Sequence, residues 1–209
     1  MKITHKKLTA ACATVALLVT ACGGTLSSTT QTQTGTAKNI YNEALKLAQL
    51  EYPGAYLIGY NNYGDSFEKP TALPASYETS GVTGNWIYLF TKSREALTDG
   101  TITKDETFSV HFSAGTITVV EETGVDEYTV TSDVAFGADL LAFDSDALYS
   151  KALDAITKKA PAGLKPLHVD FRITPGVDEV TIFTTTASGY TARFDMKKGE
   201  VTTVDQAIL

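Results

Sequence analysis

The sequence predicts an α+β fold made of two repeated units, each with one helix followed by a three- or four-stranded antiparallel sheet. Two stretches of similar build, "IYNEALKLAQLEYPGAY" at 40–56 and "LYSKALDAITKKAPAGL" at 148–164, carry an apolar stripe at helical spacing. The six stripe positions of the first stretch are again apolar 108 residues later. β-branched and aromatic runs follow each stretch, so we predict an internal duplication.

Both predicted helices have signals for their two ends. A proline with a nearby glycine stops each helix, at Pro53-Gly54 in the first and at 161–163 in the second. Side chains that can accept hydrogen bonds from free N–H groups precede each helix. The candidate caps are Thr36 or Asn39 for the first helix and Asp144, Ser145 or Asp146 for the second.

The predicted strands follow each helix in the same order. After the first helix come the runs at 55–60, 85–90, 107–112, 116–122 and 127–134, with a long loop after the first of them. After the second come the runs at 164–173, 178–186, 189–196 and 199–204. We therefore place the first α+β unit at 37–136 and the second at 137–209.

The last hairpin of the second unit, "FDMKKGEV" at 194–201, is similar to the closing hairpin of PepSY-type domains. Asp195, Gly199 and Val201 match its Asp-x-x-x-Gly-x-Val form, and Gly199 suits a turn position with positive φ. This resemblance implies a cystatin-like fold, found in propeptides and envelope proteins that bind or inhibit rather than catalyse. The tandem arrangement also resembles the architecture of beta-lactamase inhibitory proteins.

The N-terminus has the features of a secretory signal, with three early lysines and a short apolar run at 8–19. Its end, Val19-Thr20-Ala21-Cys22, resembles the lipobox of bacterial lipoproteins. The resemblance implies removal of a signal peptide at 1–21, a diacylglycerol thioether on Cys22 and acylation of the new N-terminus, for example with palmitate. The Gly-, Ser-, Thr- and Gln-rich segment 22–36 is predicted to be a flexible tether.

These features place the protein in the cell envelope, outside the cytoplasm. The lipid would anchor it in the outer membrane of a two-membrane cell, or in the outer leaflet of the cytoplasmic membrane of a one-membrane cell. Cys12 lies in the segment to be removed and Cys22 carries the lipid, so no disulfide is expected.

The mature chain is expected to be acidic. Loss of Lys2, Lys6 and Lys7 with the signal leaves 14 of the 17 basic residues against 24 acidic ones, a net charge of −10. Such a surface repels nucleic acid phosphates, so nucleic acid is not expected as a partner.

Few side chains in the mature sequence could perform catalysis. His168 and Asp170 would lie on one face of a strand, where they could orient an imidazole or bind a metal. We predict instead a solvated sheet face there. Asp144 and Asp146 precede a helix and are interpreted as caps rather than calcium ligands. We assign no catalytic residue, metal site or cofactor, and we predict that the protein is not an enzyme.

The segment 56–86 is long and polar, yet rich in aromatic side chains, a composition typical of recognition loops. The candidate binding residues are Tyr60, Tyr63, Asp65, Phe67 and Tyr77. Alternatively, these rings fold back on the edge of the core. Trp86, at the end of the segment, is predicted to be a core residue.

The anchor, the tether and the aromatic segment favour a lipid-anchored envelope protein that binds an extracytoplasmic protein without catalysis, inhibiting or sensing it. Two alternatives stay open. One is an envelope hydrolase with a site near His168 and Asp170, and the other is a structural component that assembles with itself.

Overall fold

The computed structural model describes residues 26–62, 79–98, 101–121, 128–129, 137–160 and 162–208. The helices are α1 (Ala37–Glu51) and α2 (Ser145–Thr157), with short 3-10 helices η1 (Arg94–Thr98), η2 (Lys104–Glu106) and η3 (Gly137–Leu141). The strands are β1 (Ser27–Thr29), β2 (Tyr56–Asn61), β3 (Asn85–Thr91), β4 (Thr101–Ile102), β5 (Thr107–Ser113), β6 (Thr116–Glu121), β7 (Tyr128–Thr129), β8 (His168–Thr174), β9 (Val177–Phe183), β10 (Ser188–Asp195) and β11 (Glu200–Ile208).

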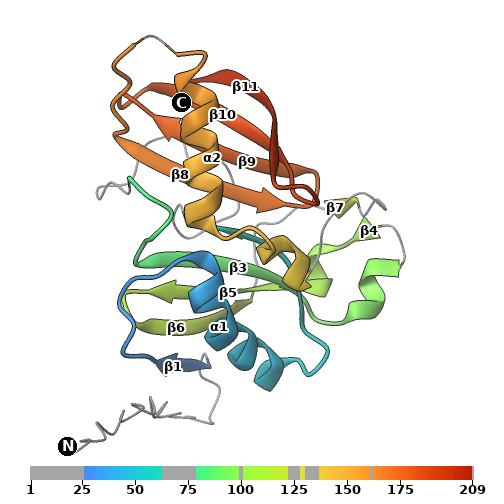
Figure 1. Ribbon diagram of the computed structural model, residues 1–209. Coiled ribbons are helices and arrows are strands. Elements are labelled where there is room, and N and C mark those ends of the chain that lie inside the picture. Colours follow the sequence, from blue (N-terminus) through green and yellow to red (C-terminus); the bar gives the residue numbers. More distant parts are fainter. Residues whose placement is uncertain are drawn as a thin grey trace, which may run out of the picture.

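Nine of these strands form one antiparallel sheet in the order β1-β6-β5-β3-β2-β8-β9-β10-β11, while β4 and β7 pair separately (Figure 1). The prediction of two repeated helix-plus-sheet units is therefore wrong, because the strands that follow both helices belong to a single sheet. β2 pairs with β3 on one side and with β8 on the other. This pairing satisfies two strand edges that separate sheets would leave open.

The join between β2 and β8 is completed by an asparagine side chain. The backbone ladder aligns two residue pairs, Tyr60 with Ile173 and Asn61 with Arg172. Beyond them, the buried Asn62 donates from Nδ2 to the Val169 carbonyl at 2.9 Å and accepts from the Phe171 N–H at Oδ1 at 2.8 Å. One side chain thus takes the place of a further backbone pair.

Asn62→Ala is expected to lower the free energy of unfolding by about 2–3 kcal/mol, because it leaves one carbonyl and one N–H of β8 buried without partners. Urea denaturation of the mature chain with Cys22→Ser would measure it. Asn85→Ala is the matched control, since Asn85 is an exposed asparagine of β3 that accepts from Ser113. A loss no larger for Asn62→Ala than for Asn85→Ala would contradict this account of the join.

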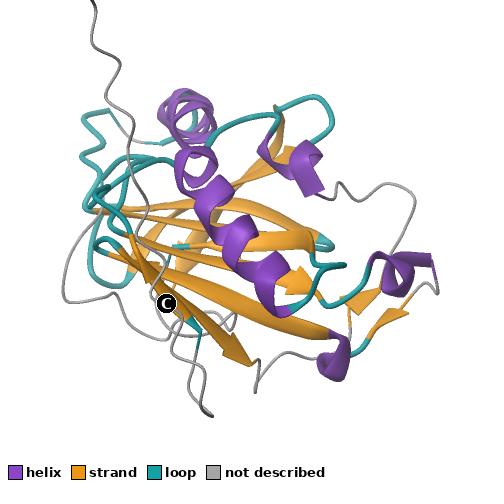
Figure 2. Ribbon diagram, turned by 90° about the horizontal axis from the view of Figure 1, so that it is seen from below, coloured by secondary structure: helices purple, strands orange, loops and turns teal. Residues whose placement is uncertain are grey.

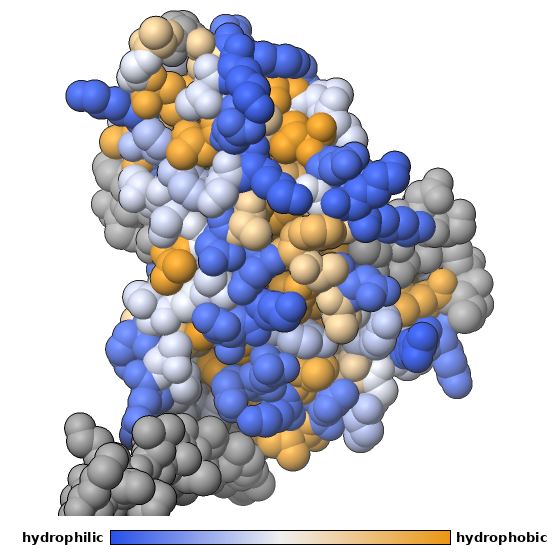
Figure 3. Space-filling view, in the orientation of Figure 1, coloured by the Kyte–Doolittle hydropathy of each residue, from blue (hydrophilic) through white to orange (hydrophobic). Residues whose placement is uncertain are grey.

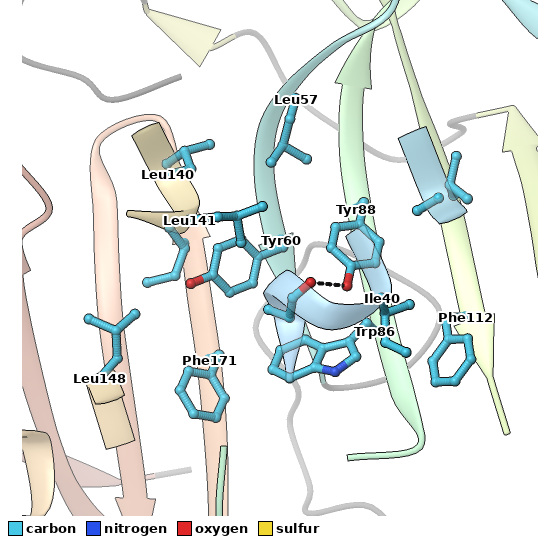
Figure 4. Close-up of a cluster of buried hydrophobic side chains, with 14 of the residues drawn as sticks. Ile40, Leu57, Tyr60, Trp86, Tyr88, Phe112, Leu140, Leu141, Leu148 and Phe171 are labelled. Carbon is cyan, nitrogen blue, oxygen red and sulfur yellow. Dashed lines mark hydrogen bonds between the residues drawn. The ribbon is translucent and has the colours of Figure 1, made fainter. Parts of the chain in front are cut away.

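Both helices cover the same face of the sheet (Figure 2). α1 lies over β2, β3, β5 and β6, and α2 lies over β9, β10 and β11. The main core lies between the helices and the sheet and is continuous across the join (Figure 4). Trp86 is fully buried there, which confirms its prediction as a core residue.

The N-termini of the two helices meet at one carboxylate. Thr36 caps α1 and Asp144 caps α2, both among the predicted candidates. The Thr36 hydroxyl donates to Asp144 Oδ2 at 2.5 Å, and Asp144 Oδ1 accepts from the N–H groups of Ser145 at 2.8 Å and Lys38 at 3.0 Å. We call Thr36, Lys38, Asp144 and Ser145 the Asp144 junction. A negative charge here lies at the positive ends of two helix dipoles.

Part of the predicted flexible tether is paired to the sheet. β1 aligns with Thr116–Thr118 of β6, and the Leu26 carbonyl accepts from the Val119 N–H at 2.8 Å. The Thr30 N–H donates to Gly115 at 2.8 Å, and Gly35 forms a bridge with Thr83. Within the predicted tether 22–36, residues 26–30 and Gly35 are therefore held by the sheet rather than free, because threonine- and serine-rich chain can extend a sheet as readily as it can form a linker.

The face of the sheet opposite the helices carries a second, smaller apolar cluster. Ile58, Ile87 and Leu89 of β2 and β3 pack there against Ile102 of β4, with Leu97 of η1 beside them. The predicted positive φ at Gly199 is confirmed, with φ of +63° in the turn between β10 and β11. No helix among the described residues is long and apolar enough to cross a membrane.

Candidate functional site

Three hollows surround Tyr190, where α2 ends beside the last strand of the sheet. Their volumes are about 320, 570 and 170 Å³. The first is lined by Ala162, Gly163, Leu164, Lys165, Thr184 and Tyr190. The second is lined by Lys159, Ala160, Tyr190, Val204, Asp205 and Gln206, and the third by Thr184, Ser188, Gly189, Tyr190, Gln206, Ala207 and Ile208.

The chain around Tyr190 is shaped by two glycines. Gly163 has φ of +89°, a conformation that glycine adopts without strain, in the segment that leads from α2 to β8. At Gly189, a Cβ atom would lie 2.3 Å from the Ile182 carbonyl oxygen, so a larger residue would not fit beside β9. Tyr190 itself is partly buried and packs against the main core. Its ring is therefore held in place while it lines the hollows.

Apolar and polar groups both border this site. Figure 3 shows hydrophobic residues on both flanks of α2, in the half of the molecule that contains the hollows. Lys159 Nζ donates to the Val204 carbonyl at 3.3 Å and so connects the end of α2 to β11. Asp205 Oδ2 accepts from Arg193 Nη1 at 3.2 Å. An aromatic ring with amide, hydroxyl and charged groups around it suits a polypeptide ligand.

The second and third hollows follow β11 along its length. One is lined by Val204 to Gln206 and the other by Gln206 to Ile208. Their offset is about two residues, the spacing at which side chains of an extended chain fall on the same side. β11 is the last strand in the sheet order and pairs with β10 alone among the described strands. Such an edge offers backbone groups to an added strand.

Of the five predicted binding residues, Tyr60 is the one that lies within the described ranges, and it does not line this site. Tyr60 has an exposed fraction of 0%, lies in the main core and contacts Trp86 with ring centroids 5.9 Å apart. The prediction that it forms part of a binding surface is therefore corrected, because its ring completes the core on the helix side of β2. Its substitution by alanine would also destabilise the fold. Tyr63, Asp65, Phe67 and Tyr77 lie outside the described residues, so their role stays a prediction.

His168 and Asp170 form a buried pair rather than a solvated face. His168 Nε2 and Asp170 Oδ1 are 2.6 Å apart, and the two residues are 0% and 6% exposed. The imidazole also stacks on Phe183, with ring centroids 6.3 Å apart. The prediction of a solvated face is therefore wrong. None of the three hollows around Tyr190 is lined by either residue.

The sequence showed Tyr190 only as a strand residue of the last hairpin. Its functional surroundings come from the segment after α2 and from β11, which meet only in the fold. A signal was nevertheless present, since Gly189 directly precedes this tyrosine and small residues often mark a close approach of backbones.

The carboxyl group of Asp178, in β9, has a pKa well above the usual value for aspartate. Burial, the charge of Asp195 and the charge of Glu179 raise the pKa of Asp178 to about 6 from 3.8. A raised pKa means that the folded state binds this proton more tightly than the unfolded state does. Ionisation of Asp178 therefore lowers stability as pH rises from about 3.8 to about 6, and the loss is complete above that range.

Asp178→Asn is expected to stabilise the protein at pH 7 by roughly 1–2 kcal/mol, a value reduced for the partial exposure of the side chain. The gain should disappear at pH 4, where the native carboxyl is already protonated in the folded state. Urea denaturation at both pH values would measure the difference from the parent chain. Asp139→Asn, in the exposed part of η3, is the control. A gain of equal size at both pH values would contradict the assignment.

Comparison with known proteins gave no relatives for this chain. No family model, no curated protein and no solved structure matches it. Within the ranges that the structure describes, no group of three or more His, Cys, Asp or Glu side chains is arranged to hold a metal ion.

Proposed function

We propose that this chain is a lipid-anchored binding protein of the cell envelope, which holds an extended segment of an extracytoplasmic protein at the β11 edge and thereby inhibits or senses that protein. The anchor is proposed from the lipobox-like sequence before Cys22. The binding mode is supported by one observation above all, that three hollows share Tyr190 beside a nine-residue edge strand.

The geometry suits strand addition. Backbone groups on the outer edge of β11 would pair with the partner, and alternate side chains of the partner would enter the second and third hollows. The Tyr190 ring would form the shared wall of those hollows. Aromatic side chains of this kind supply a large contact area at low entropic cost.

A photo-crosslinking residue at Gln206 in the envelope-located protein tests this proposal. We expect it to capture a defined extracytoplasmic polypeptide that the same residue at Asn85, on β3, does not capture. Tyr190→Ala should lower that capture by about tenfold, as expected for a central aromatic contact. Tyr149→Ala is the matched control, because Tyr149 is a partly buried tyrosine of α2 that does not line the hollows.

Two outcomes would contradict the proposal. Capture from Asn85 equal to that from Gln206 would show that contact is not specific to the β11 edge. Capture unaffected by Tyr190→Ala would show that the hollows do not contribute. A crosslinked dimer of the chain itself would instead support the alternative of self-assembly, because an open strand edge also pairs with a second copy.

The hydrolase alternative is supported by the 2.6 Å pair of His168 and Asp170, which resembles the way a carboxylate orients a general base. Both side chains are buried, so a substrate would reach them only after a change in the structure. Loss of a hydrolytic activity on His168→Gln, with folding retained, would favour this alternative over binding.

A further inference from the structure

We infer that the protein stands on the membrane on its β1 edge, so that the β11 edge and its hollows face away from the lipid. We define the β1 edge as residues 26–35 together with Thr116–Thr118 of β6. The inference rests on the lipid anchor of the proposed function and adds to it the surface that meets the membrane.

The first argument is the length of chain between the lipid and the sheet. Leu26 is fixed to the sheet, because its carbonyl accepts from Val119 at 2.8 Å, and the Thr30 N–H donates to Gly115 at 2.8 Å. Three residues lie between Cys22 and Leu26, so four Cα–Cα steps join the two, and a fully extended chain of that length spans about 14 Å at most. A lipid on Cys22 would therefore keep Leu26, the start of the β1 edge, within about 14 Å of the residue that carries the lipid.

The second argument is the order of strands. β1 is the first strand of the nine-stranded sheet and β11 is the last. Eight interstrand steps of about 4.8 Å separate them, or about 38 Å before allowance for twist. Figure 1 shows β1 and β11 at opposite ends of the molecule. If β1 lies close to the lipid, this strand order places Tyr190 of β10 at the far end of the sheet.

The third argument is charge. The mature chain is strongly acidic, yet the stretch 23–37 contains no charged residue, and neither does the part of β6 that pairs with β1. The β10–β11 hairpin, by contrast, carries six charged side chains, Arg193, Asp195, Lys197, Lys198, Glu200 and Asp205. The three basic and three acidic side chains of the hairpin cancel in net charge, but each of them would lose hydration against the headgroups, so the uncharged edge approaches the membrane at the lower electrostatic cost.

The test uses the full lipidated chain in vesicles of phosphatidylcholine and phosphatidylglycerol that contain a headgroup-attached quencher. Thr29→Cys and Thr203→Cys place single fluorophores on exposed residues of β1 and β11. Cys12 is removed with the signal and the Cys22 thiol is blocked by lipid, so each variant has one free thiol. We expect quenching to be roughly threefold or more stronger at position 29 than at position 203, given the separation across the sheet.

Two further variants sharpen the test. Gln31→Cys, in the exposed turn after β1, should be quenched like Thr29→Cys, which guards against a local effect of substituting within the strand. Insertion of about 20 Gly and Ser residues between Gly24 and Thr25 should remove the difference between positions 29 and 203, because a long flexible linker no longer fixes the distance to the membrane.

The outcomes separate the anchor from the orientation. Mass analysis of the N-terminal peptide that finds no lipid on Cys22 would overturn the proposed anchor and the inference with it. A lipidated chain with equal quenching at positions 29 and 203, or with stronger quenching at 203, would overturn the orientation alone and leave the proposed anchor and binding site intact.

Discussion

Replacing Asp144 with alanine is expected to lower the free energy of unfolding by about 3–4 kcal/mol, since it removes the cap of α2 and a hydrogen-bond acceptor at the start of α1. The carboxylate accepts from the Thr36 hydroxyl at 2.5 Å and from the N–H groups of Lys38 and Ser145 at 3.0 and 2.8 Å. Bonds to a charged acceptor are the stronger ones, and the charge also complements both helix dipoles.

Two companion variants identify which part of Asp144 is responsible. Asp144→Asn keeps one acceptor oxygen and loses the charge, so we expect an intermediate loss of about 1–2 kcal/mol. Asp146→Ala removes a nearby exposed acid whose Oδ1 accepts from the adjacent Ala147 N–H at 2.7 Å, and should cost less than about 1 kcal/mol. Denaturant unfolding would measure the loss of stability in the three variants. An equal loss for Asp144→Ala and Asp146→Ala would contradict the claim that the Asp144 junction stabilises the starts of both helices.

Trp86→Ala is expected to have the largest effect of the substitutions considered, about 4–5 kcal/mol, close to the whole stability of many domains. Trp86 is fully buried where the two halves of the sheet join, with its ring 5.9 Å from Tyr60 and 5.6 Å from Phe171. Figure 4 shows these three side chains together, from β3, β2 and β8. Its Nε1 also donates to the Gly35 carbonyl at 2.8 Å.

Trp86→Phe separates the ring from the hydrogen bond, because it keeps most of the apolar volume and leaves the Gly35 carbonyl without its indole donor. We expect a loss of about 1–2 kcal/mol from this change. Leu50→Ala, at a side chain that is 56% exposed at the end of α1, should change stability by less than about 0.5 kcal/mol. Thermal and urea unfolding would measure all three, and a small loss for Trp86→Ala would show that the join does not depend on this ring.

Local features of the fold were predictable from the sequence, whereas its longest-range feature was not. The caps Thr36 and Asp144 have residue types whose preference for helix starts is strong, and Trp86 follows the usual burial of large rings. The pairing of β2 with β8 joins residues more than 100 positions apart. No local pattern records such a pairing, so two similar helix-and-strand series gave the appearance of two separate sheets.

The candidate site was less predictable than the fold. Tyr60 and Tyr190 are both tyrosines in strands, and the sequence does not distinguish the one that is fully buried from the one that lines the hollows. That difference depends on what covers each strand. Tyr60 lies inside the main core with the Trp86 ring beside it, whereas Tyr190 packs against the border of that core and lines the hollows. His168 was assigned to solvent for the same reason, because alternation predicts which face a residue occupies and not whether that face is covered.

The pairing of β1 would also give the proposed anchor a mechanical property. Force applied through a lipid at Cys22 would act first on β1, whose three aligned residues are held to β6 at the end of the sheet. Detachment of this short strand, including the bridge between Gly35 and Thr83, would release residues 26–35. The unpaired chain between Cys22 and α1 would then be longer by about 33 Å at full extension. α1 and the main core would stay folded meanwhile. Under force, β1 would therefore detach and extend before α1 and the main core unfold.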